Sequence, residues 1–151
     1  MAQTTSSLWL DELSPGRVFE GGPRRIGERD LLFCALWDGD GQPHSNEEYS
    51  RGTPFGRRIV HGDGTLAMGI GLIHGLGIFS DSLVGCESME IKYPNPVYIG
   101  DSIRARLTIE AVEAVPGAPD GLVNGVLEII RDGGEATAVH SRLTYRVRRR
   151  A

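Results

Sequence analysis

The residues with the clearest capacity for chemistry lie between positions 36 and 62. Asp38, Asp40 and His44 stand close together there, and His61-Gly62 closes the stretch. Histidine is the side chain best suited to move protons near neutral pH, and a neighbouring carboxylate can orient it or hold a water molecule. This spacing is typical of an acid–base pair, but it also suits a solvated loop with a capping histidine.

The segment behind Gly62 reads DGTLAMGIGLIHGLGIF and predicts a buried helix over residues 63–79. The first N–H groups of a helix have no intrahelical acceptor, so this end could bind an oxygen that gains negative charge. The alternative is that Gly62 only forms a tight turn before the helix. Each glycine inside the helix costs up to about 1 kcal/mol relative to Ala. We therefore expect a sheet so close to the helix that a Cβ would clash.

Two more helices and several strands are predicted around this segment. A helix near residues 27–37 would have one apolar face, formed by Ile26, Leu31, Leu32, Ala35 and Leu36. Ser45 or Asn46 would cap a short helix that ends before Pro54. Residues 17–20 predict a short strand.

The second half of the chain predicts a sheet. Apolar and polar residues alternate strictly over residues 103–111, which indicates a strand with one buried face. Further strands are predicted over residues 83–92 and 122–131, and a hairpin turn at residues 132–134 leads into the last one. The predicted fold is α+β, with an antiparallel β-sheet wrapped around a long central buried helix.

Composition limits the classes of protein and of site. The chain has 151 residues and a net charge of −4, which argues against bulk attraction to nucleic acid or to an anionic membrane. Its two cysteines have no CxxC spacing and predict neither a disulfide framework nor a zinc site. Cys34 lies in an apolar run and is expected to be a buried thiol. We expect His74 to be a core histidine and His140 to be on the surface.

The predicted domain organisation is simple. Residues 1–12 read as a loose N-terminal lead-in, residues 13–148 as a single domain, and residues 149–151 as a basic tail. The N-terminus shows no signal-peptide pattern, and no apolar run reaches the length of a membrane span. A cytoplasmic protein is therefore expected.

Three segments follow one another in a recognisable order. They are HSNEEYSRGTPFGRRIVHG, the Gly-rich apolar segment behind it, and IKYPNPVYIGDSIRARLTI. This order resembles the MaoC-like dehydratases, a family of (R)-specific enoyl-CoA hydratases with the hot-dog fold, over about residues 13–148. The resemblance implies a lyase that hydrates an enoyl thioester or dehydrates an (R)-3-hydroxyacyl thioester in fatty acid or polyketide metabolism. It also implies a homodimer or higher even oligomer.

The resemblance assigns roles to single residues. His44 matches the family's catalytic histidine, and Gly62 matches the glycine whose backbone N–H binds the thioester oxygen. The family's aspartate comes five residues before the histidine, where this chain has Gly39. Asp40-Gly41-Gln42-Pro43 resembles the family's D-x-N-P, so Asp40 is the first choice for the catalytic carboxylate, and Asp38 is the alternative.

Other residues are candidates for binding the substrate. Gln42 stands where the family has Asn, and His61 precedes the glycine, so both are candidates beside the oxyanion site. Arg57 and Arg58 could contact the phosphates of coenzyme A, or they could be ordinary surface arginines. No cofactor and no metal are expected, since the acyl group would be carried on coenzyme A or a phosphopantetheine arm.

Two other functions remain open at this point. Hot-dog folds host thioesterases as well as hydratases, because a fold does not fix a reaction. A non-catalytic subunit that binds an acyl thioester is the third hypothesis, and the shifted aspartate is what favours it.

Overall fold

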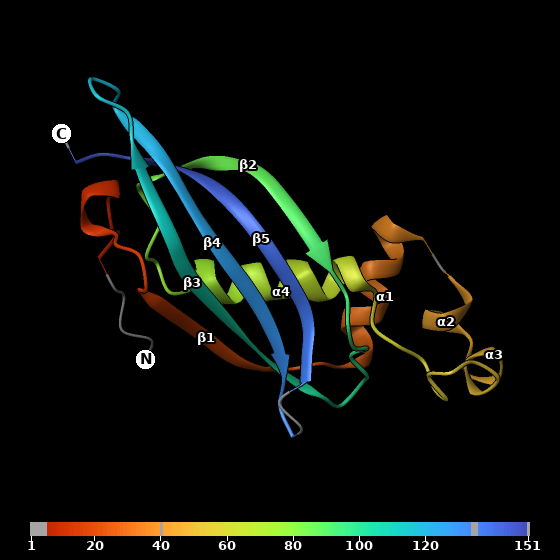
Figure 1. The fold of residues 1–151 in the computed structure, drawn as a ribbon. Helices are drawn as coiled ribbons and strands as arrows, with labels where there is room; N and C mark the ends of the chain where they lie inside the picture. Colours follow the sequence, from red (N-terminus) through yellow and green to blue (C-terminus); the bar gives the residue numbers. More distant parts are fainter. Residues whose placement is uncertain (1–5, 40, 134–135, 151) are drawn as a thin grey trace.

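The computed structural model describes residues 6–39, 41–133 and 136–150. In that part of the chain, five strands form one antiparallel sheet in the order β1-β3-β4-β5-β2, and the sheet curves around helix α4 (Gly62–His74) (Figure 1). The strands are β1 (Val18–Arg25), β2 (Leu83–Lys92), β3 (Ser102–Ala114), β4 (Asp120–Arg131) and β5 (Ala136–Arg148). This is the α+β, hot-dog architecture that the sequence predicts.

Strand β3 shows why the sequence forms this sheet. Its inward side chains are almost completely buried: Ile103, Ala105, Leu107 and Ile109. Its outward side chains are partly exposed, and Arg106 donates to Glu20 of β1 at 2.7 Å. Alternation therefore gives the sheet one face for the core and one for water, as predicted.

Glycines let α4 lie close to the sheet. A Cβ on Gly69 would lie 2.2 Å from Cδ1 of Ile129, and one on Gly21 of β1 would lie 2.4 Å from the carbonyl oxygen of Leu72. Close packing thus explains these two glycines, as expected. It does not explain Gly71, where a Cβ would meet no atom within 4 Å.

One face of α4 is open, so the prediction of a helix buried on all sides is wrong. Asp63, Ala67, Gly71 and His74 are exposed along this face. The helix also ends at His74 rather than at Phe79, and the prediction of a core histidine at position 74 is wrong. The sheet covers one side of the helix only, and apolar neighbours in the sequence do not reveal which side that is.

Helices α1 (Glu28–Asp38), α2 (Gln42–Ser45) and α3 (Glu47–Arg51) lie together beyond the N-terminal end of α4 (Figure 1). We call them the helix group. In α1, Leu31 and Cys34 are buried, whereas Leu32 is 61% exposed and Leu36 is 82% exposed. The predicted single apolar face is therefore wrong, because α1 rests on α4 along one narrow side. The prediction of a buried thiol at Cys34 is confirmed.

The described part of the N-terminal lead-in is packed rather than loose. Leu10 is 1% exposed in a short 3-10 helix, η1 (Leu10–Glu12), and the N–H of Leu8 donates to the carbonyl oxygen of Ile78 at 2.7 Å. The basic end of the chain lies against η1, where Arg150 is 3.7 Å from Glu12. Residues 1–5 lie outside the described residues. None of the described helices is long and apolar enough to cross a membrane.

Candidate active site

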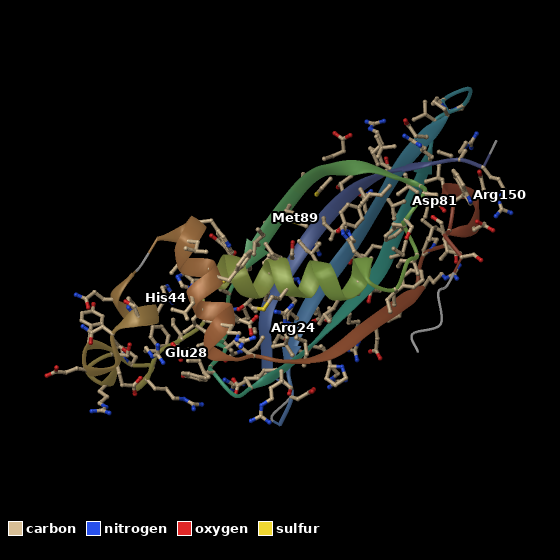
Figure 2. All side chains as sticks on the ribbon, turned by 180° about the vertical axis from the view of Figure 1, so that it is seen from behind. Arg24, Glu28, His44, Asp81, Met89 and Arg150 are labelled. Carbon is tan, nitrogen blue, oxygen red and sulfur yellow. The ribbon has the colours of Figure 1, made fainter. Side chains whose placement is uncertain are left out.

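His44 lies in α2 and is held by the connector that leads to α4. The Nδ1–H of His44 donates to the carbonyl oxygen of Ile59 at 2.8 Å, and the N–H of Ile59 donates to Pro43 at 3.0 Å. Because a carbonyl oxygen only accepts, the neutral ring carries its hydrogen on Nδ1 and a lone pair on Nε2. That tautomer can take a proton at Nε2. Figure 2 shows His44 near Glu28, at the end of the molecule formed by the helix group.

His61 lies directly against His44. The two rings are stacked, with centroids 3.8 Å apart and planes 20° apart. The Nε2–H of His61 donates to the carbonyl oxygen of Gly39 at 3.2 Å, and its Nδ1 has no hydrogen-bond partner among the described residues. The residue is only 2% exposed. The structure therefore packs His61 against His44 and leaves little of its surface for a direct substrate contact.

The two candidate carboxylates flank Gly39. Asp40 lies outside the described residues, and Asp38 is described only as the last residue of α1. Gly39, which stands between them, has a φ of 86°, a left-handed value that favours glycine. The choice between Asp38 and Asp40 stays a prediction, and the bond from His61 reaches the carbonyl oxygen of Gly39, which stands between them in the sequence.

Gly62 is the first residue of α4. The N–H of Thr65 bonds back to the carbonyl oxygen of His61 at 2.9 Å, so the N–H groups of the three preceding residues have no intrahelical acceptor. The ring of Tyr93 covers this turn, because a Cβ on Gly62 would lie 3.0 Å from Cε1 of Tyr93. The first turn of α4 therefore has the free donors that an oxyanion site needs.

Sequence reasoning missed Asp63 and Tyr93. The Tyr93 hydroxyl donates to Oδ1 of Asp63 at 2.6 Å, beside Gly62. A carboxylate in the first turn of a helix is favoured by the helix dipole, and that was the one signal available in the sequence. Nothing in the spacing of residues 63 and 93 indicates that they meet.

Two cavities lie beside the start of α4. The first has a volume of about 400 Å³ and is lined by His44, His61, Arg58 and the apolar residues Leu31, Ala35 and Leu36. The second has a volume of about 380 Å³, and its lining includes Gly62, Asp63, Thr65 and Tyr93. The structure therefore brings His44 to His61, and it places Gly62 on a neighbouring cavity rather than on the same one.

The two candidate arginines differ in their surroundings. Arg58 donates twice to Glu28, at 2.8 and 2.7 Å, and lies 3.4 Å from Glu47. The hydrogen bond from Arg58 lowers the pKa of the Glu28 carboxyl below its usual value. The guanidinium of Arg57 is exposed and stacks on the Tyr98 ring at 4.0 Å. Arg57 is therefore the better placed of the two for a phosphate.

The remaining polar candidates are on the surface. Gln42 is exposed, and its Oε1 accepts from Nδ2 of Asn46 at 2.9 Å. His140 lies on the outer side of β5, 3.8 Å from Glu128, and its side chain is 40% exposed, as expected for a surface histidine. The part of the chain that the structure describes has no group of three His, Cys, Asp or Glu side chains placed to hold a metal ion.

Residues 12–124 match the family described as the MaoC like domain. The chain belongs to this family. The MaoC-like domain resembles a monoamine oxidase regulatory protein from Archaeoglobus fulgius with a TM-score of 0.88 and 20% identity, over 98% of this chain and 99% of that one. It also resembles the MaoC-like dehydratase from Rhodospirillum rubrum, with a TM-score of 0.87 and 22% identity, over 96% of this chain and 99% of that one.

The chain also resembles a third solved structure, the unliganded R-hydratase PhaJ1 from Pseudomonas aeruginosa. Its TM-score is 0.77 and its identity 21%, over 95% of this MaoC-like chain and 88% of that chain. At such low identity these likenesses show the fold alone. No curated protein matches the chain.

Proposed function

We propose that this MaoC-like protein is a hydratase/dehydratase that acts on an enoyl thioester or an (R)-3-hydroxyacyl thioester. The observation that carries the proposal is the hydrogen bond between Nδ1 of His44 and the carbonyl oxygen of Ile59. This bond leaves a lone pair on Nε2, so His44 can exchange a proton at the cavity that it lines with Arg58 and His61. A histidine held in this way suits a general acid/base.

The reaction needs two proton movements and one new bond. In the hydration direction, His44 and Asp40 share one water molecule. One of the two side chains takes a proton from the water while the water oxygen bonds to the β-carbon. The other side chain gives a proton to the α-carbon. In the dehydration direction the same groups exchange these roles. Asp38 replaces Asp40 in this scheme if the outer aspartate is the true partner.

Gly62 supplies the third component of the proposed site, the donor for the thioester oxygen. As the β-carbon is attacked, negative charge develops on the thioester oxygen, and the N–H groups in the first turn of α4 can stabilise it. His44 and Gly62 line neighbouring cavities. In this proposal the thioester binds at the start of α4, between those cavities, so that its carbonyl faces Gly62 and its α- and β-carbons face His44. Arg57, on the same side of the molecule as Phe55 and Tyr98, contacts the carrier's phosphates.

One assay separates this function from the alternatives. Crotonyl-CoA is incubated with the protein, and loss of enoyl absorbance is followed beside release of free thiol. Loss of absorbance without thiol supports the hydratase. Thiol release supports a thioesterase, and binding of the thioester without either change supports a non-catalytic subunit. His140→Ala, on the outer side of β5, is the matched control for changes at His44.

We also infer that the protein forms a homodimer or a higher even oligomer. Strand β2 is at an edge of the sheet and presents unpaired backbone groups, which natural proteins usually cover. Val84 in this strand is 47% exposed. Sedimentation at micromolar concentration is expected to give a mass well above the 16.4 kDa of one chain. A mass near that of one chain would contradict the inference.

A further inference from the structure

We propose that His61 is a positioning residue that fixes the acid–base histidine and the Gly39 backbone relative to the start of α4. The inference rests on the proposed function, since it assigns His61 a role in the same site. It replaces the substrate contact that the sequence suggests for this histidine.

Three contacts of His61 carry the inference. Its ring stacks on His44 at 3.8 Å, and its Nε2–H donates to Gly39 at 3.2 Å. The peptide bond joins it directly to Gly62. One residue therefore connects the proton-transfer group and Gly39 through its side chain, and the first N–H donor of α4 through its backbone.

The burial of His61 argues for an indirect part in the reaction. The residue is 2% exposed and its ring stacks on His44, so little of its surface is available to a substrate and we expect it to act through its neighbours. A hydrogen on Nδ1 would be buried without an acceptor, whereas a hydrogen on Nε2 reaches the oxygen of Gly39. The contacts thus select the Nε2–H tautomer of His61 and the Nδ1–H tautomer of His44.

The ring of His61 does two separable things. Its flat face packs on the His44 ring and limits rotation of that ring about χ2. Its hydrogen bond ties the end of α1 to the start of α4, although the two partners are 22 residues apart in sequence. A displacement of about 1 Å in a reacting group can cost about 10²-fold in rate, so loss of either contact is expected to reduce turnover.

Two substitutions separate the stack from the hydrogen bond. His61→Phe keeps a flat ring against His44 but cannot donate to Gly39, and His61→Ala loses both contacts. We expect kcat for crotonyl-CoA hydration to fall about 10-fold in the Phe variant and about 100-fold in the Ala variant, with KM within about two-fold. His140→Ala is expected to match the wild type. A folded His61→Ala protein with unchanged kcat would overturn the proposal, as would a change confined to KM.

A second measurement is independent of activity. In wild-type protein, imidazole ¹⁵N shifts are expected to show hydrogen on Nδ1 of His44 and on Nε2 of His61, and NOEs are expected between the two rings. A His44 ring that averages between orientations, or the reverse tautomers, would overturn the proposal even if every variant failed to fold. If the wild type has no hydratase activity, the proposed function fails while these spectra still decide the positioning role.

Discussion

In the sheet, apolar side chains such as Ile103 and Val139 are completely buried, whereas in α1 of the helix group Phe33 is 64% exposed and Leu36 is 82% exposed. Each sheet strand is paired over much of its length, and α4 packs against strands β1, β3, β4 and β5. The helix group instead rests on α4 along a narrow side and is tied down by a few polar contacts. Stability therefore resides mainly in the sheet and α4, whereas the proposed acid–base residue His44 lies in the more exposed helix group.

The largest expected effect is on the helix group. His44→Ala should reduce hydration about 10²–10⁴-fold, the usual loss when a general acid/base is removed. The melting temperature of the His44→Ala variant should change little, because His44 is only partly buried and lies outside the hydrophobic core. Steady-state rates and thermal unfolding of the same preparation check both statements. An unchanged rate would contradict the acid–base role of His44. A large loss of stability would contradict the statement that stability resides mainly in the sheet and α4.

The aspartates should respond unequally. Asp40→Asn is expected to reduce hydration about as much as the His44 change, since both belong to one proton-transfer pair. Asp38→Asn is expected to reduce it much less. Initial rates of the two variants, measured at equal protein concentration, decide between them. If Asp38→Asn is the severe change instead, the outer aspartate is the partner of His44.

A pair of glycine changes tests the sheet and α4. Gly21→Ala places a Cβ 2.4 Å from the backbone oxygen of Leu72, so it should destabilise the fold by about 1–3 kcal/mol. Gly71→Ala, one residue before Leu72, meets open space and should stabilise α4 by up to about 1 kcal/mol. Chemical denaturation measures both values. Destabilisation by Gly71→Ala would show that another surface packs on the open face of α4 in solution.

The smallest expected effect concerns the ion pair between Glu28 and Arg58. The hydrogen bond from Arg58 lowers the pKa of Glu28, so its stabilising contribution is present above the usual carboxyl pKa and is lost as pH falls through the lower folded-state value. Because the Glu28 side chain is 50% exposed, we expect less than about 1 kcal/mol. Glu28→Gln should be less stable than wild type at about pH 7, and this difference should shrink at acidic pH as Glu28 becomes protonated in the folded protein.

Thermal unfolding at neutral and at acidic pH measures this difference. Glu48→Gln, on the exposed side of α3, is the matched control and should differ little from wild type at either pH. A difference between Glu28→Gln and wild type that persists at low pH would mean that Glu28 stabilises the helix group by packing rather than by charge.

The same contrast explains which features the sequence could predict. Strand β2 has the predicted bounds, and Asn46 caps α3 by accepting from the N–H of Tyr49 at 3.0 Å. Both depend on local periodicity or on residues three positions apart. The stack of His44 on His61 depends on Ile59, 15 residues from His44, and on Gly39, 22 residues from His61. No periodic pattern connects such positions, so the sequence offers candidate residues for the site but does not predict how they meet.

The basic end of β5 lies against η1, with Arg149 3.5 Å from Asp11 and Arg150 3.7 Å from Glu12. Figure 2 shows Arg150 at the far end of the molecule from His44. A pulling force applied at the two ends of the described chain would therefore act first on η1 and on the last residues of β5. The helix group would carry that load only after these contacts break, so a molecule tethered by its ends should keep its proposed site unloaded.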